Sequence, residues 1–388
     1  MTRVGHVLAS PFPALRGTQG YLFELMRAQA ALGHEVHLFC YAGRLDGEVP
    51  PRVTLHRSPP LPGVPSALRS SPGLARPVND LALLGRLLSD PATRRMEVLH
   101  GHNHEGGLAA LLAGRALGIP VVHQVHGNLE AELESWAGAG RARLLGPLAP
   151  LAGLLFDRRL PAASDACLRL RAPEDRADFV GEVLPPGISP AAEQAPGLDR
   201  AALARSLGAG PWVAYAGNLD PYQDLPRLFA TVRWLGEERP GLRLLIVSHD
   251  PPEARERVVQ EGGLKEGAVR VVEAPDAAAA ARWIVAAGLL LVPRTEPGGL
   301  PLKILNAIGL GVPVVTTLAA AAGLGEEAGV VAGGASPEAL AEAVLGVIED
   351  PGRRQALQEA AERFTRANTW ENVARACETV YQKLTADR

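Results

Sequence analysis

The residues best suited to chemistry follow a pair of glycines, Gly298 and Gly299, and open an expected helix at Pro301. Glycines let a ligand approach the backbone, and the unpaired first N–H groups of a helix carry partial positive charge, so such a helix start attracts anions. Lys303 in the first turn would add a full charge, and Asn306 lies three residues further on the same helix face. One interpretation of this pattern places a diphosphate at Lys303 and a sugar hydroxyl at Asn306. The alternative is an ordinary βαβ unit with a solvated lysine.

Two strands and one helix must position these residues. The apolar run 289–292 is suited to a strand that is buried on both faces. Leu302, Leu305 and Ile308 recur at helical spacing, and the glycines at 309 and 311 end the helix before a second strand at 312–315.

The chain has 388 residues, enough for two domains of about 190 residues each. A formal net charge of −3 with scattered basic residues argues against a nucleic-acid partner. Three cysteines, at 40, 167 and 377, are far apart and are expected to be small core residues in a reducing compartment. Neither a signal peptide nor an apolar run of about 18 residues is present, so a cytoplasmic protein is expected.

The first half of the chain alternates expected strands and helices. Strands are expected at 4–9, 35–40, 97–100 and 121–125, a helix following the loop 10–20 is expected to reach residue 32, and another helix is expected at 107–117. Ligands of open parallel sheets bind at the carboxyl ends of strands, so the loop 10–20 is expected to border a site, with a solvated connection as the alternative. Its glycines do not form the dinucleotide fingerprint. The proline-rich residues 58–78 are expected to form a mobile surface excursion.

Histidines alternate at 100, 102 and 104, from the last residue of the third of these strands into the segment that follows it. They could ligate a metal if the chain is extended, but no further cluster in the sequence supports them, so loop histidines near a polar cleft are favoured. His126, Gly127 and Asn128 follow the fourth strand at the ligand edge, and a helix is expected from residue 128. This place favours a functional His126 over an inert exposed histidine.

Residues 141–160 are apolar with arginines at both ends. A membrane-surface or lipid-acceptor face is one interpretation. Prolines at 147 and 150 interrupt the helical pattern, so a helix packed on the domain is favoured. A strand after residues 164–166 and a last strand at 183–188 complete this half, and 189–197 is the expected linker.

The second half begins a new series of strands and helices. Strands are expected at 212–216, 242–248, 269–273 and 329–332, with helices at 225–235, 252–260, 276–287, 337–349 and 353–366. A loop at 217–224 follows the first of these strands, and a last helix at 370–386 is expected to cross back to the first domain. The alternation predicts an α/β fold with two parallel, helix-covered sheets facing each other, in domains 1–188 and 189–369 with a crossing segment 370–388.

The order of these motifs resembles the retaining nucleotide-sugar glycosyltransferases of family 4, which have the GT-B fold, two Rossmann-like parallel-sheet domains facing across a cleft. The resemblance spans essentially the whole chain. Its carriers are RGTQ at 16–19, GHEV at 33–36, VHG at 125–127, PPGI at 185–188, AGNL at 216–219, PLK at 301–303 and GVPVV at 311–315. Each is modest alone, and their order and spacing together indicate the fold.

The chain departs from the family pattern at four positions. Gly298 and Asn306 stand where the family usually has two glutamates, and Asn218 and Gln223 stand where it has Arg and Lys. We expect Lys303, with Arg294, to take over the phosphate charge, and Asn306 to bind the ribose in place of the second glutamate.

The resemblance implies a donor nucleotide in the second domain and an acceptor in the first, near Gly17 and His126. The implied donor contacts are Gly17, Gly217, Asn218, Gln223, Arg294, Gly298, Gly299, Leu300, Lys303 and Asn306, and the implied acceptor contacts are Arg16, Thr18, His102 and Asn128. The implied catalytic residues are Glu296 and His126, which is expected to hydrogen-bond the transferred sugar rather than act as a base. No metal or other cofactor is expected, because no Asp-any-Asp motif lies in a suitable loop.

The implied activity is transfer of a hexosyl group, with retention of configuration, from a nucleotide-diphosphate sugar of the UDP or GDP type to the hydroxyl of an unidentified acceptor. The missing carboxylates support an alternative, a non-catalytic GT-B protein that binds a sugar nucleotide or a partner. A sugar-nucleotide epimerase on the same fold is a third interpretation, which would need more active-site carboxylates than the sequence offers. A peripheral membrane contact is kept among the expected interactions.

Overall fold

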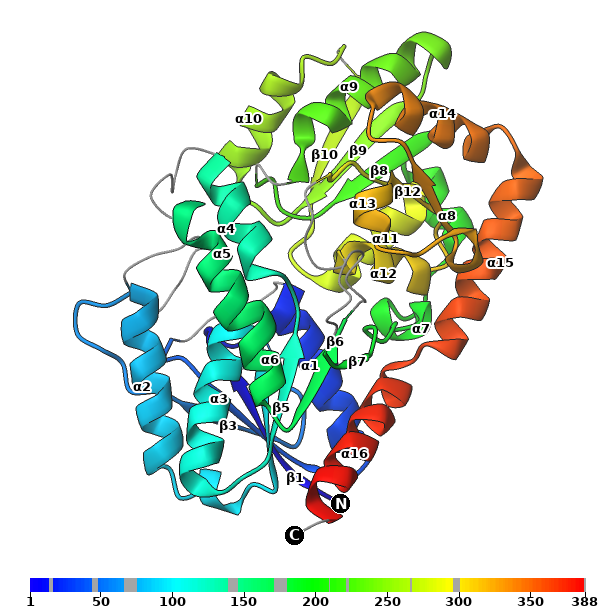
Figure 1. Ribbon diagram of the computed structural model, residues 1–388. Coiled ribbons are helices and arrows are strands. Elements are labelled where there is room, and N and C mark those ends of the chain that lie inside the picture. Colours follow the sequence, from blue (N-terminus) through cyan, green and yellow to red (C-terminus); the bar gives the residue numbers. More distant parts are fainter. Residues whose placement is uncertain are drawn as a thin grey trace. The chain divides into compact units, whose positions relative to one another are not determined.

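The computed structural model describes residues 1–13, 17–43, 48–65, 75–138, 146–170, 180–208, 210–220, 223–265, 267–295 and 301–386. The chain forms two compact units, one of Met1–Gly187 with Trp370–Arg388 and one of Ile188–Thr369. Each unit contains one parallel β-sheet accompanied by helices (Figure 1). The predicted α/β class is therefore confirmed.

The first unit is built on a seven-stranded sheet in which every neighbouring pair is parallel. Its order is β3 (Val53–Arg57), β2 (Glu35–Cys40), β1 (Arg3–Leu8), β4 (Val98–His102), β5 (Val121–Val125), β6 (Ala166–Arg169) and β7 (Glu182–Val183). The central strands are buried along their whole length, as expected for strands covered on both faces. The strand order reverses between β1 and β4, and ligands of such sheets bind at this switch point.

The helices of the first unit lie between these strands in the chain, with one exception. They are α1 (Gly17–Ala31), α2 (Ala75–Ser89), α3 (Asn103–Leu117), α4 (Leu129–Gly138), α5 (Ala149–Ala152), a π-helix (Gly153–Arg159) and α6 (Leu160–Ala163), with short 3-10 turns at Thr93–Arg95 and Gly146–Leu148. The exception is α16 (Trp370–Ala386), which packs on α1 (Figure 1). Its Val373, Cys377 and Tyr381 share a buried cluster with Val4 and Tyr21.

The second unit is built on a six-stranded parallel sheet. Its order is β10 (Val269–Glu273), β9 (Arg243–Ser248), β8 (Trp212–Ala216), β11 (Leu290–Val292), β12 (Val314–Thr317) and β13 (Val330–Gly333). Apolar side chains of alternate strand residues enter two separate clusters, one on each face of the sheet. The order reverses between β8 and β11, so the switch point lies beside the segment that carries Lys303.

The helices of the second unit flank this sheet. They are α7 (Ala191–Gln194), α8 (Arg200–Ser206), α9 (Leu225–Glu238), α10 (Pro252–Gly262), α11 (Ala277–Ala287), α12 (Leu302–Gly309), α13 (Leu318–Ala321), α14 (Pro337–Ile348) and α15 (Pro351–Ala367), with a 3-10 turn at Glu326–Ala328. Six of them are capped by a side chain that accepts a backbone N–H of the first turn, from Asp199, Asp224, Asp276, Thr317, Ser336 and Asp350.

Several predicted elements need correction. Strand β3 was not expected, and α2 begins within the excursion predicted at 58–78, whose residues 66–74 lie outside the described part of the chain. The predicted linker at 189–197 contains α7, and α8 and α13 were also not expected. Strand β4 extends to His102 and α3 begins at Asn103, so the region predicted as a histidine loop is regular structure.

The three cysteines are free and buried, as predicted for small core residues. In the described residues, no helix combines the length and the hydropathy that crossing a bilayer requires.

Candidate functional site

Lys303 lies in the first turn of α12 and reaches the carboxyl end of β8. Its Nζ donates to Gln223 Oε1 at 2.9 Å and to Tyr215 Oη at 3.3 Å, and it lies 4.3 Å from the centre of the Tyr215 ring. Both hydrogen-bond partners are uncharged. Within the described part of the chain, Lys303 has no carboxylate as an ion-pair partner.

Gly217 makes room for this ammonium group. A Cβ at position 217 would lie 2.6 Å from Lys303 Nζ, which is closer than real contacts allow. The φ angle of Gly217 is +135°, a conformation that strains any residue with a Cβ. The turn after β8 therefore needs glycine both for its backbone and for the lysine that lies against it.

The ammonium group of Lys303 lies at this end of the sheet without a carboxylate beside it among the described residues. Burial, with the nearby charge of Arg294, lowers the pKa of Lys303 from 10.5 to about 7. A structural lysine would normally find a carboxylate at such a depth, because an unpaired buried charge is costly. A bound anion would supply the missing negative charge and raise the pKa again.

Asn218 and Gln223 hold each other in place. Gln223 Nε2 donates to Asn218 Oδ1 at 2.7 Å, and Asn218 Nδ2 donates to Asp220 Oδ2 at 3.0 Å. Tyr215 Oη donates to the carbonyl oxygen of Asn218. The amide of Gln223 thus presents its oxygen to Lys303 and its nitrogen to Asn218, which orients the lysine.

The other predicted donor contacts divide into two groups. Asn306 is exposed, and no described residue hydrogen-bonds its side chain; its backbone carbonyl accepts from Gln194 Nε2 and from the Leu310 N–H, both at 3.0 Å. Pro301 precedes α12 as its N-cap rather than as its first residue and carries no capping side chain. Glu296, Gly298, Gly299 and Leu300 lie outside the described residues.

In the first unit, His126 follows β5 and is partly exposed. Its Nε2 lies 3.1 Å from His102 Nδ1, and its ring packs edge-on against Tyr21 at a centroid distance of 4.9 Å. Burial lowers the pKa of His126 to about 3, with smaller contributions from His123 and His104. The imidazole is therefore neutral near pH 7, which suits a hydrogen-bonding role.

A buried ion pair fixes the helix that follows His126. Asp157, on the π-helix, accepts the backbone N–H of Leu129 at 2.9 Å and that of Glu130 at 3.0 Å, so it binds the start of α4. The same carboxylate lies 2.9 Å from His104 Nε2. Burial opposes both charges, but the pair and its hydrogen bonds prevail, raising the pKa of His104 and lowering that of Asp157. This pair was not predicted from the sequence, in which His104 and Asp157 are 53 positions apart.

The remaining predicted acceptor contacts lie in separate places. Asn128 Oδ1 accepts the backbone N–H of Ala131 at 2.9 Å, so this side chain already caps α4. Thr18 Oγ1 accepts from Asn103 Nδ2 at 3.4 Å. Gly17 is exposed, with open space where a Cβ would lie, and Arg16 lies outside the described residues.

The prediction of loop histidines is wrong for His100 and His102. Both belong to β4, both are fully buried, and they form a cluster with His6 of β1, whose possible ligand atoms all lie within 4.8 Å of one another. This cluster is not visible in the sequence, because His6 is 94 positions from His100 in the chain and the parallel pairing of β1 with β4 brings them together. Imidazole nitrogens can ligate metals, but His6 and His102 already hydrogen-bond each other at 2.9 Å.

Tyr215, which contacts Lys303, was not predicted as a site residue from the sequence. It is the fourth residue of a buried strand, where an aromatic side chain is normally a core residue. Its place two residues before Gly217 was the available signal, because a tyrosine there can keep its ring in the core and its hydroxyl at the strand end.

Comparison with known proteins agrees with this geometry. Residues 16–168 match the family model of the glycosyl transferase 4-like domain, and residues 210–350 match that of the glycosyl transferases group 1. A D-inositol 3-phosphate glycosyltransferase of Xylanimonas cellulosilytica is 27% identical, over 96% of this chain and 93% of the relative. One from Kribbella flavida is 26% identical, over 95% of this chain and 91% of the relative.

Solved structures share the fold. Sucrose-phosphate synthase from Thermosynechococcus elongatus aligns over 100% of both chains with a TM-score of 0.80 and 18% identity. Anabaena Alr3699/HepE, solved in complex with UDP-glucose, aligns over 98% of this chain and 99% of that one with a TM-score of 0.69 and 15% identity. With both halves matched by glycosyltransferase models, the chain belongs to the family 4 glycosyltransferases and has the GT-B fold.

Proposed function

We propose that this glycosyltransferase moves a hexosyl group, with retention of configuration, from a nucleotide-diphosphate sugar to an acceptor hydroxyl. The observation that carries the proposal is Lys303, a partly buried cation whose hydrogen-bond partners among the described residues are both uncharged and whose pKa is lowered by burial. Such a site lacks an anion, and a diphosphate supplies one. The solved complexes of Anabaena Alr3699/HepE with UDP and with UDP-glucose make the UDP type the first donor to test.

In this proposal the second unit stabilises the leaving group. Breaking the bond between the sugar and the diphosphate places new negative charge on the phosphate oxygen. Lys303, held by Gln223 and Tyr215, would interact with that charge without reorganising, which is how a preoriented group lowers a barrier. Asn306, exposed one turn further along α12, is the proposed partner of the ribose.

The first unit would hold the acceptor, with His126 hydrogen-bonding the transferred sugar. Both curated relatives carry the name D-inositol 3-phosphate glycosyltransferase, so this phosphorylated cyclitol is the first acceptor to test. Thr18 and Asn128, whose side chains stand at the starts of α1 and α4, are proposed to border the acceptor.

The test is a turnover assay with UDP-, GDP- and ADP-sugars, each with and without D-inositol 3-phosphate or a cell extract as acceptor. We expect nucleotide release that depends on the acceptor, and NMR of the purified product should show the anomeric configuration of the donor. Inversion would refute the retaining mechanism. Tight binding of a sugar nucleotide without release under any acceptor would favour the non-catalytic alternative.

A peripheral membrane contact is also proposed, on the helical segment 146–160. Leu148, Leu151, Leu154 and Leu155 are 51%, 53%, 40% and 44% exposed, while Ala149, Gly153, Asp157 and Leu160 of the same segment are buried. The segment is therefore packed on the unit, as favoured from sequence, and still presents leucines beside Arg158 and Arg159. Co-sedimentation with anionic vesicles should fall for Leu151→Gln and stay unchanged for Leu112→Gln, an exposed leucine of α3. Equal sedimentation of both variants and wild type would remove this surface from the proposal.

A further inference from the structure

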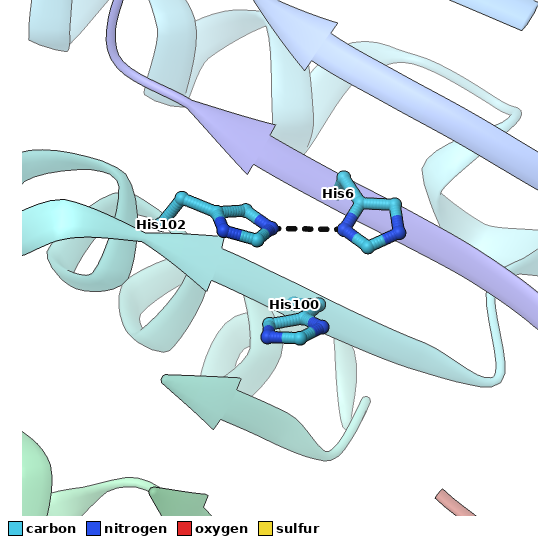
Figure 2. A group of neighbouring side chains, drawn as sticks. All are labelled: His6, His100 and His102. Atoms are coloured by element: carbon cyan, nitrogen blue, oxygen red, sulfur yellow. Dashed lines mark hydrogen bonds between the residues drawn. The ribbon is translucent and has the colours of Figure 1, made fainter. Parts of the chain in front are cut away.

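A chain of hydrogen bonds links three imidazoles of the first unit. His6 Nδ1 lies 2.9 Å from His102 Nε2, and His102 Nδ1 lies 3.1 Å from His126 Nε2. At the inner end, His6 Nε2 lies 2.7 Å from Gln29 Oε1, and Gln29 Nε2 donates to Tyr381 Oη at 3.0 Å. Figure 2 shows the inner part of this chain, with His6 and His102 joined by a hydrogen bond and His100 beside them.

The parallel register of the sheet produces this alignment. His6 of β1 pairs with His100 of β4, and His102 lies two residues further on the same face of β4. His102 pairs in turn with Gln124 of β5, and His126 is again two residues further. The imidazoles therefore run from the middle of the sheet toward its carboxyl edge, where ligands of parallel sheets bind.

All three imidazoles are neutral at physiological pH. Burial lowers the pKa of His6 to about 4 and that of His126 to about 3, and it holds the pKa of His102 well below its usual value. A neutral imidazole has one N–H donor and one acceptor nitrogen, so each ring must donate at one end and accept at the other. Once one end of the chain is fixed, every tautomer along it is fixed.

The inner end sets the direction. The side-chain oxygen of Gln29 can only accept, so His6 donates from Nε2 and must accept at Nδ1. His102 then donates from Nε2 to His6 and accepts at Nδ1, and His126 donates from Nε2 to His102. The Nδ1 lone pair of His126 remains, and no described residue donates to it.

We propose that Gln29, acting through His6 and His102, fixes the tautomer of His126 so that its Nδ1 accepts a hydrogen bond from a substrate hydroxyl. Gln29, His6 and His102 are thus positioning residues, since all three are fully buried whereas His126 is partly exposed beyond the end of β5. That the group bound at Nδ1 is a substrate hydroxyl rests on the proposed function. The tautomer of His126 follows from the hydrogen bonds alone and does not depend on that function.

The same geometry weighs against a metal ion in the cluster of His6, His100 and His102. A metal would need the lone pairs of at least three nitrogens, and His6 and His102 share one proton in the hydrogen bond between their candidate ligand atoms. His100 Nδ1 also has a partner, Tyr381 Oη at 2.7 Å. Metal binding would therefore break the hydrogen bonds that link the imidazoles, so detecting a bound metal at this cluster would contradict the proposal.

The test is a long-range ¹⁵N–¹H correlation spectrum of the full chain with ¹⁵N-labelled histidine, which distinguishes the two neutral tautomers. We expect His6, His102 and His126 to be neutral and protonated at Nε2 from pH 6 to pH 8, with no change on adding Zn²⁺. A proton on Nδ1 of His126, a mixture of its tautomers, or a zinc-dependent shift of His6 and His102 would overturn the proposal.

Two variants test the control from the inner end. Tyr381→Phe removes the acceptor that orients the Gln29 amide, and Gln29→Met removes the acceptor of His6; both should give a tautomer mixture at His126. The His37–His56 pair, whose nitrogens lie 2.8 Å apart elsewhere in this unit, should keep its signals and so report intact folding. A pure Nε2–H tautomer of His126 in both folded variants would contradict the proposal.

The kinetic readout separates this proposal from the proposed function. In Gln29→Met, kcat should fall in proportion to the fraction of His126 that leaves the Nε2–H tautomer, about twofold for an equal mixture, while nucleotide affinity in the second unit stays unchanged. Unchanged kcat with scrambled tautomers would refute the positioning role. Absence of transferase activity in the wild type would refute the proposed function and leave the tautomer assignment to the spectra alone.

Discussion

Replacing Lys303 with methionine removes the charge of the proposed diphosphate site and keeps the length of the side chain. A hydrogen bond to a charged group contributes about 1.5–3 kcal/mol, so the affinity for a sugar nucleotide should fall about 10- to 150-fold. The affinity for the matching nucleoside, which lacks phosphate, should change less than about twofold. Lys265→Met, at an exposed lysine of the same unit, is the matched control.

The same substitution should not destabilise the free protein. The pKa of Lys303 falls from 10.5 to about 7 in the folded chain, so the folded state releases a proton that the unfolded state keeps. At pH 7 and below, the lowered pKa of Lys303 reduces the free energy of unfolding by at most about 5 kcal/mol, and this reduction disappears as the pH rises from 7 toward 10.5. Partial exposure and the two hydrogen bonds offset most of it, so we expect Lys303→Met to be about 1 kcal/mol more stable at pH 7. A residue that weakens the free fold and strengthens ligand binding is functional rather than structural.

Calorimetry in buffers of different ionisation enthalpy measures both effects. A lysine with a pKa of about 7 is half protonated at pH 7, and a bound diphosphate raises its pKa, so binding should take up about half a proton in wild type and none in Lys303→Met. Equal losses of nucleoside and sugar-nucleotide affinity, or unchanged proton uptake in the variant, would refute the assignment of Lys303 to the phosphate.

Three further substitutions test the surrounding contacts. Gly217→Ala places a methyl group against Lys303 Nζ, so the affinity for a sugar nucleotide should fall about tenfold. The control Gly236→Ala, where a Cβ meets open space, should leave this affinity unchanged. Equal affinities of the two variants would show that the turn does not position the lysine. Asn306→Glu restores the usual family carboxylate and should change sugar-nucleotide affinity severalfold, whereas an unchanged affinity and rate would show that this position does not face the ribose. Asp157→Asn should lower the free energy of unfolding by about 3 kcal/mol, most clearly between pH 4 and 6.5. The lowered pKa of Asp157 stabilises the folded state above pH 3.8, and the raised pKa of His104 stabilises it below pH 6.5, so both contributions are present in that window. A difference from wild type that does not depend on pH in urea titrations would contradict that ion pair.

The strands of the second unit lie at or near the residues predicted for them from the sequence. Strands β8 and β10 begin and end at the predicted residues, because short apolar runs between turn residues leave little choice for a parallel sheet. Strand β3 was missed because it lies at the edge of its sheet and is only partly buried, so its sequence VTLHR shows no apolar run. The start of α2 was hidden by its position directly after a proline-rich stretch.

The candidate sites were predictable only in part. Gly217, Gln223 and Lys303 do come together, because strand ends of a parallel sheet meet at one edge and the motifs mark those ends. The histidine chain was not predictable, since a run of histidines and glycine resembles a polar loop. Their burial depends on partners far away in the chain, such as Gln29 and Tyr381, which are 352 positions apart. Buried polar groups need such partners, and a single sequence does not reveal them.

The central claim is that a diphosphate binds at Lys303, and a crystal structure with the sugar nucleotide selected by a thermal-shift screen tests it most directly. We expect phosphate oxygens within about 3 Å of Lys303 Nζ and beside the first N–H groups of α12, with Gln223 still oriented toward the lysine. A nucleotide bound elsewhere, with Lys303 unchanged and the start of α12 occupied by the protein's own side chains, would contradict it.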